Sequence, residues 1–256
     1  MITPAFNRDR FTWMAYWMLA YFAYQQAALG PLVPFLRGEL HLSYTVGGLH
    51  LSAFSAGMIL AGLSVNRLVQ RWGRRRVFWA SGAGMAVGAL LLVLGHHVIL
   101  TIAASLVMGL PGTVMLILIQ ATLSDRHGER RAIALTESNV IASMGAGIAP
   151  LMVGGLQRIG IGWRGAPVVG ALVWVFLLLR FRREPMPANV SESQLGAARQ
   201  IPLPPLYWIY WAVVFLVVSV EWCVIFWGAD FLENNVGLGR VTAATLMSVF
   251  FLAMVI

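Results

Sequence analysis

Long apolar stretches separated by short polar segments dominate the pattern of this 256-residue chain. Each stretch is close to the roughly 20 residues that an α-helix needs to cross a bilayer. No ten-residue segments alternate apolar and polar side chains, as the strands of a membrane barrel would. The pattern therefore predicts an all-α polytopic membrane protein with seven complete spans and the start of an eighth. The predicted spans run over residues 12–36, 44–65, 77–95, 98–123, 132–156, 166–179, 206–228 and from 241 onward.

The two ends of the sequence add two expectations. The eighth predicted span is still apolar at Ile256, where it is shorter than a full span, so we expect a truncated chain. The first apolar run is too long for the core of a secretory signal and has no small-residue cleavage site before the next span. We therefore expect the N-terminal segment to be retained as a membrane span.

Composition agrees with a bilayer as the solvent. Hydrophobic residues make up 59% and charged residues 11% of the chain, whereas charged residues in soluble domains are near ~25%. The net charge of +8 would suggest nucleic acid in a soluble protein. Here all the basic residues are arginines, and they lie in short loops between apolar runs. We expect the lipid bilayer as a partner and no nucleic acid.

The arginines are distributed unequally between the two sides of the predicted membrane. Fourteen of them fall on the side of the N-terminus and only four on the other side. Cytoplasmic loops carry the excess of Arg and Lys, so the N-terminus is predicted to be cytoplasmic in a plasma (inner) membrane. The four arginines of the opposite side are Arg37, Arg158, Arg164 and Arg240.

One long connection divides the chain. It contains charges, serines and several prolines, which favour a flexible cytoplasmic linker. We predict a six-helix transmembrane bundle at residues 1–180, a linker at 181–205, and an incomplete second bundle at 206–256 with one full helix and a truncated one.

The segment between the second and third predicted spans carries the most informative motif. A glycine is followed by an Asn-Arg pair, then by Arg-Trp-Gly and three arginines. This resembles the signature loop of the major facilitator superfamily, in which a Gly, an Asp-Arg pair and Gly-Arg-Arg join the second and third helices. The alternative is that the arginines only set the orientation in the membrane. The residues that carry the resemblance are Gly62, Asn66, Arg67, Arg71, Gly73, Arg74 and Arg75.

The motif departs from the family pattern at its acidic position. Asn66 stands where the family has an acid, or Gln70 does if the second half sets the register. The two halves also lie about one helical turn further apart than in the family. We therefore do not expect the charge lock between bundles that the family forms with that acid.

Three further features resemble the same family. The fifth span has a Gly/Pro stretch like the one found there in many antiporters, with a longer spacing from Pro to Gly. The tripeptide Gly162-Trp163-Arg164 precedes the sixth span, and Gly30-Pro31 to Pro34 ends the first span before an amphipathic loop at 36–43. The resemblance implies twelve helices in two six-helix bundles, each a pair of inverted three-helix repeats, with substrate near the midplane. The fifth-span residues are Gly147, Pro150, Gly154 and Gly155.

Glu221 is the acidic residue placed well inside a predicted span. An ionised carboxylate there is costly unless it is protonated, paired or facing a wet cavity. We interpret Glu221 as a proton-titrating or substrate-binding carboxylate, and the alternative is that its side chain reaches the outer interface.

Other polar residues inside the spans have two interpretations each. Gln25 and Gln26, with Tyr21 and Tyr24, could bind a hydroxyl-rich substrate or could cross-bond neighbouring helices. For His50 we favour a contact with a loop over a proton relay.

No catalytic triad, phosphate-binding loop or paired His-Glu motif is found, and the single Cys223 forms no disulfide framework. We expect no enzyme, cofactor or metal. The sequence favours a secondary active transporter that moves a small solute by alternating access, coupled to protons, with a sugar-like or other organic substrate. The alternative is a fragment or remnant of such a transporter that does not transport.

Overall fold

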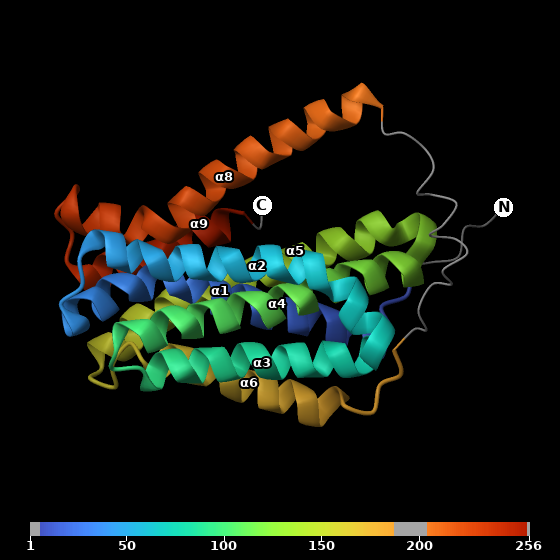
Figure 1. Cartoon of the computed structure of the whole chain (residues 1–256), viewed down its shortest axis with the longest axis horizontal. Helices are drawn as coiled ribbons and strands as arrows, with labels where there is room; N and C mark the ends of the chain where they lie inside the picture. The colour runs from blue at the N-terminus through green and yellow to red at the C-terminus, as the bar shows by residue number, and fades with distance from the viewer. Residues whose placement is uncertain (1–5, 187–203, 255–256) are drawn as a thin grey trace.

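The computed structural model describes residues 6–186 and 204–254, and all the regular structure within these ranges is helical (Figure 1). The elements are α1 (Arg10–Leu40), α2 (Tyr44–Trp72), α3 (Arg74–Leu94), α4 (Val98–His127), the short 3-10 helix η1 (Gly128–Arg130), α5 (Arg131–Arg158), α6 (Gly165–Phe181), α8 (Pro205–Asn234) and α9 (Arg240–Ala253).

The predicted spans lie within these helices, except that the third was predicted to end one residue after α3 does, and the predicted all-α fold is confirmed. Four helical stretches are long and apolar enough to cross a bilayer by length and composition, and two more are apolar but shorter. The predicted linker falls mostly in residues 187–203, which lie outside the described residues, and it stays a prediction. The four long stretches are Tyr44–Trp72, Arg74–Leu94, Val98–Arg158 and Pro205–Asn234.

The end of α1 differs from the sequence prediction. Pro31 and Pro34 were expected to end the first span before a loop at 36–43, but both lie inside α1, which continues to Leu40. The helix ends at His41, which adopts a left-handed conformation (φ 52°) and donates its backbone N–H to the carbonyl of Arg37. Both prolines are buried among neighbouring helices, whose packing holds the proline-containing turns in place.

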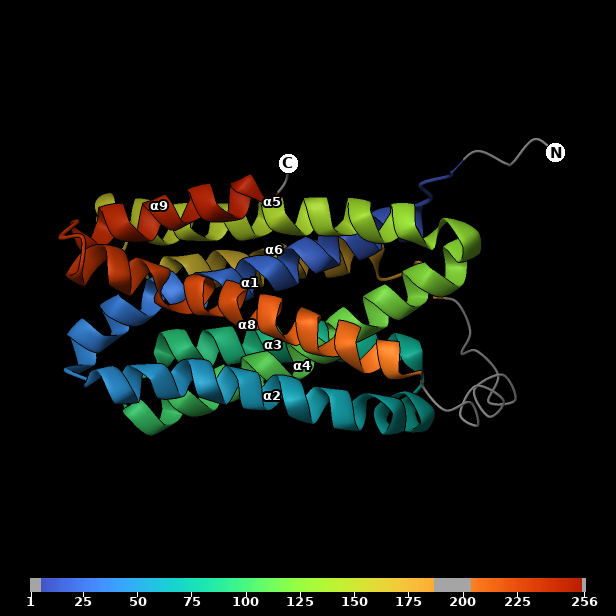
Figure 2. The ribbon, with the colours of Figure 1, turned by 90° about the horizontal axis from the view of Figure 1, so that it is seen from above.

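Helices α1 to α6 form one bundle, and α8 and α9 pack on one side of it. The most extensive interfaces are α1–α5, α2–α4, α3–α4 and α5–α9, while α8 touches α1. Figure 2 shows α9 alongside α5 and α8 crossing near α1. The helix α1 is therefore the central element, and most of its side chains are buried.

Small residues allow the closest helix contacts. A Cβ atom added to Gly57 of α2 would lie 2.6 Å from the carbonyl oxygen of Leu106 in α4. A Cβ added to Gly109 of α4 would overlap the carbonyl oxygen of Phe54 in α2. The two backbones pack directly against each other, since lipid gives apolar side chains little reason to associate.

Three consecutive charged residues at the start of α1 form ion pairs with α5, with the end of α4 and with the segment after α6. Arg8 donates to Glu137 of α5 (Nε–Oε2 2.8 Å), Asp9 accepts from Arg126 at the end of α4 (2.7 Å), and Arg10 pairs with Glu184 after α6 (2.7 Å). Burial alone would raise the pKa of Asp9, but hydrogen bonds from Thr12 and Arg126 hold it below its usual value. These pairs close the arginine-rich end of the bundle.

At the opposite end, the Gly-Trp-Arg tripeptide before α6 joins α1 to α3. Arg164 donates to the carboxylate of Glu39 in the last turn of α1 (2.7 Å) and to the carbonyls of Val93 and Gly95. Those carbonyls lie at the C-terminal end of α3, where no further helical N–H can reach them. The arginine of the tripeptide thus provides hydrogen bonds to the carbonyls at the end of α3 and an ion pair with the carboxylate at the end of α1.

We expect Arg164→Gln to lower the stability of the protein by about 2 kcal/mol, because charge-assisted bonds to partly buried carbonyls are lost. Arg164 also holds the pKa of Glu39 below its usual value. Stabilisation from this pair is present above the ordinary glutamate pKa of about 4.3 and is lost as the pH falls through it and below. Thermal unfolding in detergent between pH 7 and pH 3.5 measures both effects. The mutant should lose part of the acid sensitivity of the wild type, and an unchanged acid profile would contradict the role of Arg164.

Candidate functional site

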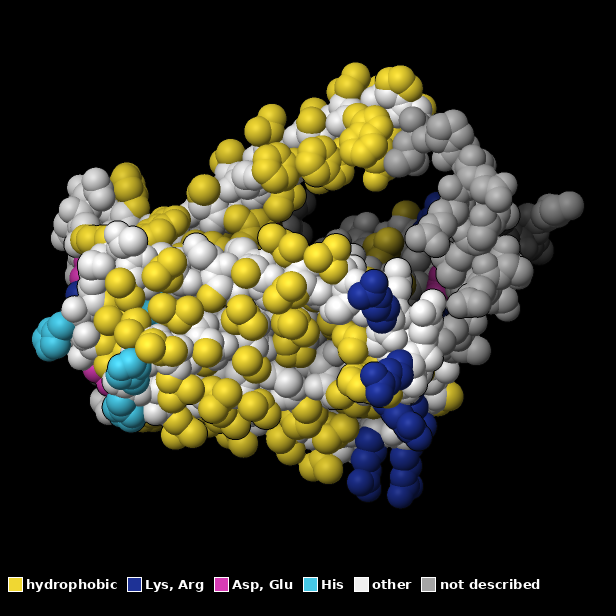
Figure 3. All heavy atoms as spheres, in the orientation of Figure 1, with side chains coloured by type: hydrophobic (Ala, Val, Ile, Leu, Met, Phe, Trp, Pro, Cys, Tyr) yellow, Lys and Arg dark blue, Asp and Glu magenta, His cyan; other side chains and the backbone are white. Residues whose placement is uncertain are grey.

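The second half of α8 contacts the bundle, and its first half stands away from it. Side chains from Pro204 to Val218 are exposed, while Ile225, Phe226 and Ala229 are buried. Figure 3 shows an opening between the first half of α8 and the bundle, and apolar side chains border it. The opening faces the arginine-rich end, because the other end of α8 is packed against α1.

A glycine sets the distance between α1 and α8. A Cβ added to Gly30 would overlap the carbonyl oxygen of Ile225, so the two backbones touch at this level. About two turns further along α1 and about one and a half turns further along α8, Arg37 pairs with Asp230. In each helix the second contact lies C-terminal to the first. The helices α1 and α8 therefore run parallel with a fixed register.

This register places Gln26 and Glu221 at the same depth. Each lies four residues before a contact residue, Gln26 before Gly30 and Glu221 before Ile225. Both side chains are half-buried. Within the described part of the chain, Glu221 has no hydrogen-bond or ion-pair partner. An amide and an unpaired carboxylate therefore lie level with each other where the two helices begin to separate.

Gln25 and Tyr21, also predicted to bind substrate, lie on the opposite side of α1. The amide of Gln25 is fully buried and donates to the carbonyl of Pro167 in α6 (3.2 Å). The hydroxyl of Tyr21 donates to the carbonyl of Gly82 in α3 (3.2 Å). Both bonds are contacts between helices, which was the alternative interpretation. Their part in substrate binding stays a prediction, and Gln26 is the better placed of the four polar residues of α1.

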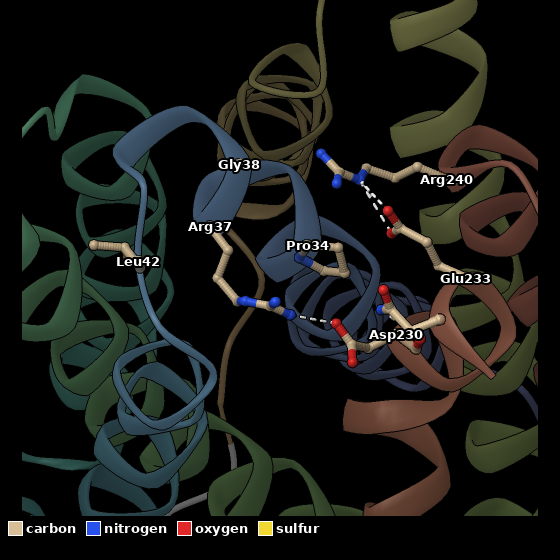
Figure 4. A pocket seen from close by; sticks show the side chains of 8 residues that line it. Pro34, Arg37, Gly38, Leu42, Asp230, Glu233 and Arg240 are labelled. Carbon is tan, nitrogen blue, oxygen red and sulfur yellow. Dashed lines mark hydrogen bonds and ion pairs between the residues drawn. The ribbon is translucent and has the colours of Figure 1, made fainter. Parts of the chain in front are cut away.

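Ion pairs close the other end of the interface between α1 and α8. The side chains of Arg37 and Asp230 are each only 14% exposed. The guanidinium of Arg37 also lies 3.5 Å from the ring centroid of Tyr44 at the start of α2. The pair borders a polar pocket of about 210 Å³ between α1, α8 and α9 (Figure 4). Glu233 of α8 and Arg240 of α9 form a second pair there (2.8 Å), and the Arg240 guanidinium also lies 5.7 Å from the ring centroid of Phe35 in α1.

Sequence reasoning missed the pair between Arg37 and Asp230. Each residue is a single charge near the end of a predicted span, and the two are 193 positions apart. Arg37 was counted only as a signal of orientation. The one available signal was that an arginine and an aspartate both lie near span ends on the side of the membrane that has few arginines.

The signature-loop residues lie at the arginine-rich end, within the six-helix bundle. Asn66 and Arg67 are exposed in the last turns of α2, and Gly73 turns the chain into α3 with a positive φ of 78°. Arg74 pairs with Asp125 of α4 (3.0 Å), and Arg75 donates to the carbonyl of Arg182 after α6. These bonds of Arg74 and Arg75 join elements of one bundle, in keeping with the missing acid at Asn66. Gly62 and Arg71 are exposed on α2, and no described atom approaches a Cβ placed on Gly62 within 4 Å.

The fifth-helix motif faces α9. A Cβ on Gly147 would lie 2.9 Å from Leu252, and one on Gly154 would lie 3.0 Å from the carbonyl of Val241. Pro150 is buried between them, whereas Gly155 has open space around it. The motif accordingly lets α9 pack closely on α5.

His50 does not contact a loop, so that expectation is wrong. Its Nε2 lies 2.8 Å from the hydroxyl of Thr101 in α4, and its Nδ1 lies 3.0 Å from the carbonyl of Val46. The buried imidazole links α2 to α4, since α4 begins early enough to place Thr101 beside it. Among the described residues, no group of three or more His, Cys, Asp or Glu side chains is arranged to hold a metal ion.

Comparisons with known proteins agree with this architecture. The drug efflux pump JefA of Mycobacterium tuberculosis is 30% identical over 174 residues, which are 66% of this chain and 33% of that protein. The crystal structure of a D-xylose-proton symporter matches 95% of this chain and 66% of its own length, with a TM-score of 0.75 and 13% identity. A peptide transporter of the POT family, solved with sulfate, matches 93% of this chain and 48% of its own (TM-score 0.59, 16% identity).

The chain thus spans about a third of the length of the curated relative and up to about two thirds of the solved structures. The two structures, at 13% and 16% identity, show the fold. A model of the Major Facilitator Superfamily matches residues 15–256, almost the whole sequence. The chain is a multi-pass membrane protein that belongs to the major facilitator superfamily of transporters.

Proposed function

We propose that the protein is a proton-coupled secondary transporter of a small organic solute, with Glu221 as the carboxylate that binds the coupling proton. The observation that carries this proposal is the unpaired, half-buried Glu221 at the level of Gln26. Burying a carboxylate in a membrane protein without a partner is expensive, and such residues commonly mark ion or substrate pathways. Neutralisation by a proton or by a cationic group on the substrate removes that cost.

The two ends of the interface between α1 and α8 support a mechanism of alternating access. One end is closed by the pair Arg37–Asp230, and the first half of α8 stands away from the bundle at the other. In the proposed cycle, the solute and the proton enter through the open end and bind near Gln26 and Glu221. The Arg37–Asp230 pair then breaks when the opposite end opens. The predicted lack of enzymatic activity is consistent with membership in a transporter family.

The test is transport by the purified protein in proteoliposomes with an imposed pH gradient. A pH-sensitive dye inside the vesicles reports proton movement when candidate solutes, including pentoses, hexoses and small organic cations, are added. The proposal expects saturable solute movement that a protonophore abolishes. If the rate of solute movement does not depend on the pH gradient, the transport is not coupled to protons. No saturable movement of any solute by the 256-residue chain would favour the alternative of a fragment that does not transport.

Drug export is a second candidate, and the 30% identity to a drug efflux pump favours it. The aromatic side chains on the first half of α8 would suit a planar, apolar substrate. Uptake of radiolabelled sugar by whole cells and efflux of a fluorescent dye from loaded cells separate the two functions. A strain expressing the protein should change one of these rates and leave the other at the level of the empty vector.

We also propose that the arginine-rich end and the N-terminus lie in the cytoplasm of cells whose plasma membrane holds the protein. The split of fourteen arginines to four supports this orientation. A reporter enzyme that works only in the cytoplasm should be active when fused after Ala198 and silent when fused after Gly160. The reverse pattern would overturn the orientation. It would also place the closed Arg37–Asp230 end on the cytoplasmic side.

A further inference from the structure

The helices α3 and α6 lie side by side at the edge of the bundle and run in opposite directions. Two contacts fix their register. Arg75 donates to the carbonyl of Arg182, and a Cβ added to Gly82 would overlap the indole nitrogen of Trp174. The beginning of α3 is therefore level with the end of α6, and both segments are rich in arginine.

Few carboxylates are available to balance this cluster. Asp125 is paired with Arg74, and Glu184 is paired with Arg10. The remaining arginines of the cluster are exposed, and among the described residues no carboxylate pairs with them. Several cations held close together in this way attract an anion from the surroundings. We call this set the α3–α6 arginine cluster, and its members are Arg75, Arg76, Arg180, Arg182 and Arg183.

An apolar strip runs from this cluster along each of the two helices. On α3 the exposed face begins at Arg76 and continues through Ala80, Val87, Leu90 and Leu94 at helical spacing. On α6 the corresponding face consists of Leu172, Phe176 and Leu179, which are more than 60% exposed, and it ends at Arg183. Figure 3 shows apolar side chains along the edge formed by α3 and α6, with basic side chains at the end where α3 begins. The two neighbouring helices thus each carry one apolar strip, and both strips end at the same cationic site, as the two acyl chains of a phospholipid end at one headgroup.

We propose that the face formed by α3 and α6 binds an anionic phospholipid. Its phosphate accepts hydrogen bonds from Arg76, Arg180 and Arg183, and its acyl chains lie along the two apolar strips. Guanidinium groups suit this ligand because they bond phosphate oxygens in pairs and keep their charge at any physiological pH. A free phosphate ion would use the cations but not the strips, so the structure favours the lipid. The bound lipid would brace α3 against α6 on the side of the bundle remote from α8.

Native mass spectrometry of the purified protein tests this proposal. The protein is titrated with phosphatidylglycerol, with phosphatidylcholine of the same chains, and with inorganic phosphate. We expect phosphatidylglycerol to bind most tightly, and the double variant Arg76→Gln/Arg183→Gln to bind it roughly 10- to 30-fold more weakly. The variant Arg76→Lys/Arg183→Lys keeps the charge, so it should retain most of the binding and should show that the fold tolerates changes at both positions.

The matched control is Arg130→Gln/Arg131→Gln, which removes the same charge at the same end of the bundle but from the start of α5. It should bind phosphatidylglycerol as the wild type does. Equal binding by the wild type and the Arg76/Arg183 glutamine variant would overturn the proposal, and so would an equal loss in the control. Inorganic phosphate that competes as well as the lipid would overturn the choice of lipid as the ligand.

Discussion

Replacing Glu221 by glutamine is expected to reduce transport driven by a pH gradient to the level of protein-free vesicles. Glutamine has nearly the same shape and fills the same place beside the opening between α1 and α8. It cannot bind or release a proton, so inward movement of protons can no longer be linked to movement of the solute. Because Glu221 has no hydrogen-bond or ion-pair partner among the described residues, its replacement should leave the packing of α8 intact.

Exchange of solute for solute should survive this substitution. Exchange needs the binding site and the change between two states, but it needs no net movement of protons. The expected signature is therefore the loss of gradient-driven accumulation with most of the exchange rate retained. Both rates are measured with radiolabelled solute in the same preparation of proteoliposomes, with the solute identified in the screen described above.

The matched control is Glu233→Gln, the same substitution three turns later in α8. Glu233 already has a cationic partner in Arg240 and lies in the pocket at the closed end. This variant should keep gradient-driven transport. If Glu221→Gln accumulates solute with the pH dependence of the wild type, then Glu221 is not the coupling residue. If both variants lose transport equally, the effect belongs to the helix as a whole.

The helices themselves could be predicted from the sequence because the bilayer imposes one length on every span. The errors lie at the ends, where helices extend into the interface beyond their apolar segment. In α1 the prolines suggested an end that the structure does not have, since packing against neighbouring helices preserves the helix around the buried Pro31 and Pro34. Local signals for a helix end are weaker than burial in a bundle.

The direction in which each polar side chain points could not be predicted in the same way. Gln25 and Gln26 are adjacent in sequence. Apolar residues are spread almost evenly around α1, so the sequence does not show which face of the helix meets which neighbour. Their positions differ because the carbonyl of Pro167 in α6 lies on one side of α1 and α8 lies on the other. The hydrogen-bond partner of a polar side chain on a central helix comes from an element more than a hundred residues away in the sequence. For the same reason the Arg37–Asp230 pair emerges only when α8 docks on α1.

Breaking that pair is expected to open the closed end of the interface. In the variant Asp230→Asn, Arg37 loses its counter-charge and keeps only the ring of Tyr44. Removing one partner of a fully buried pair costs several kcal/mol, and here both side chains retain slight exposure. We therefore expect a cost of about 1.4 kcal/mol to the closed state, which corresponds to a tenfold change in an equilibrium.

Leu42 lines the pocket at this end and serves as the reporter position. In a Cys223→Ser background, Leu42→Cys should react with a membrane-impermeant maleimide about tenfold faster when Asp230 is changed to Asn. The control is again Glu233→Gln, because it removes a carboxylate of the same pocket whose ion pair is with Arg240 of α9 and not with an arginine of α1. The exchange Arg37→Asp/Asp230→Arg should bring the labelling rate back toward the wild type. Equal labelling in wild type and Asp230→Asn, or equal acceleration by Glu233→Gln, would show that the pair between α1 and α8 does not hold this end closed.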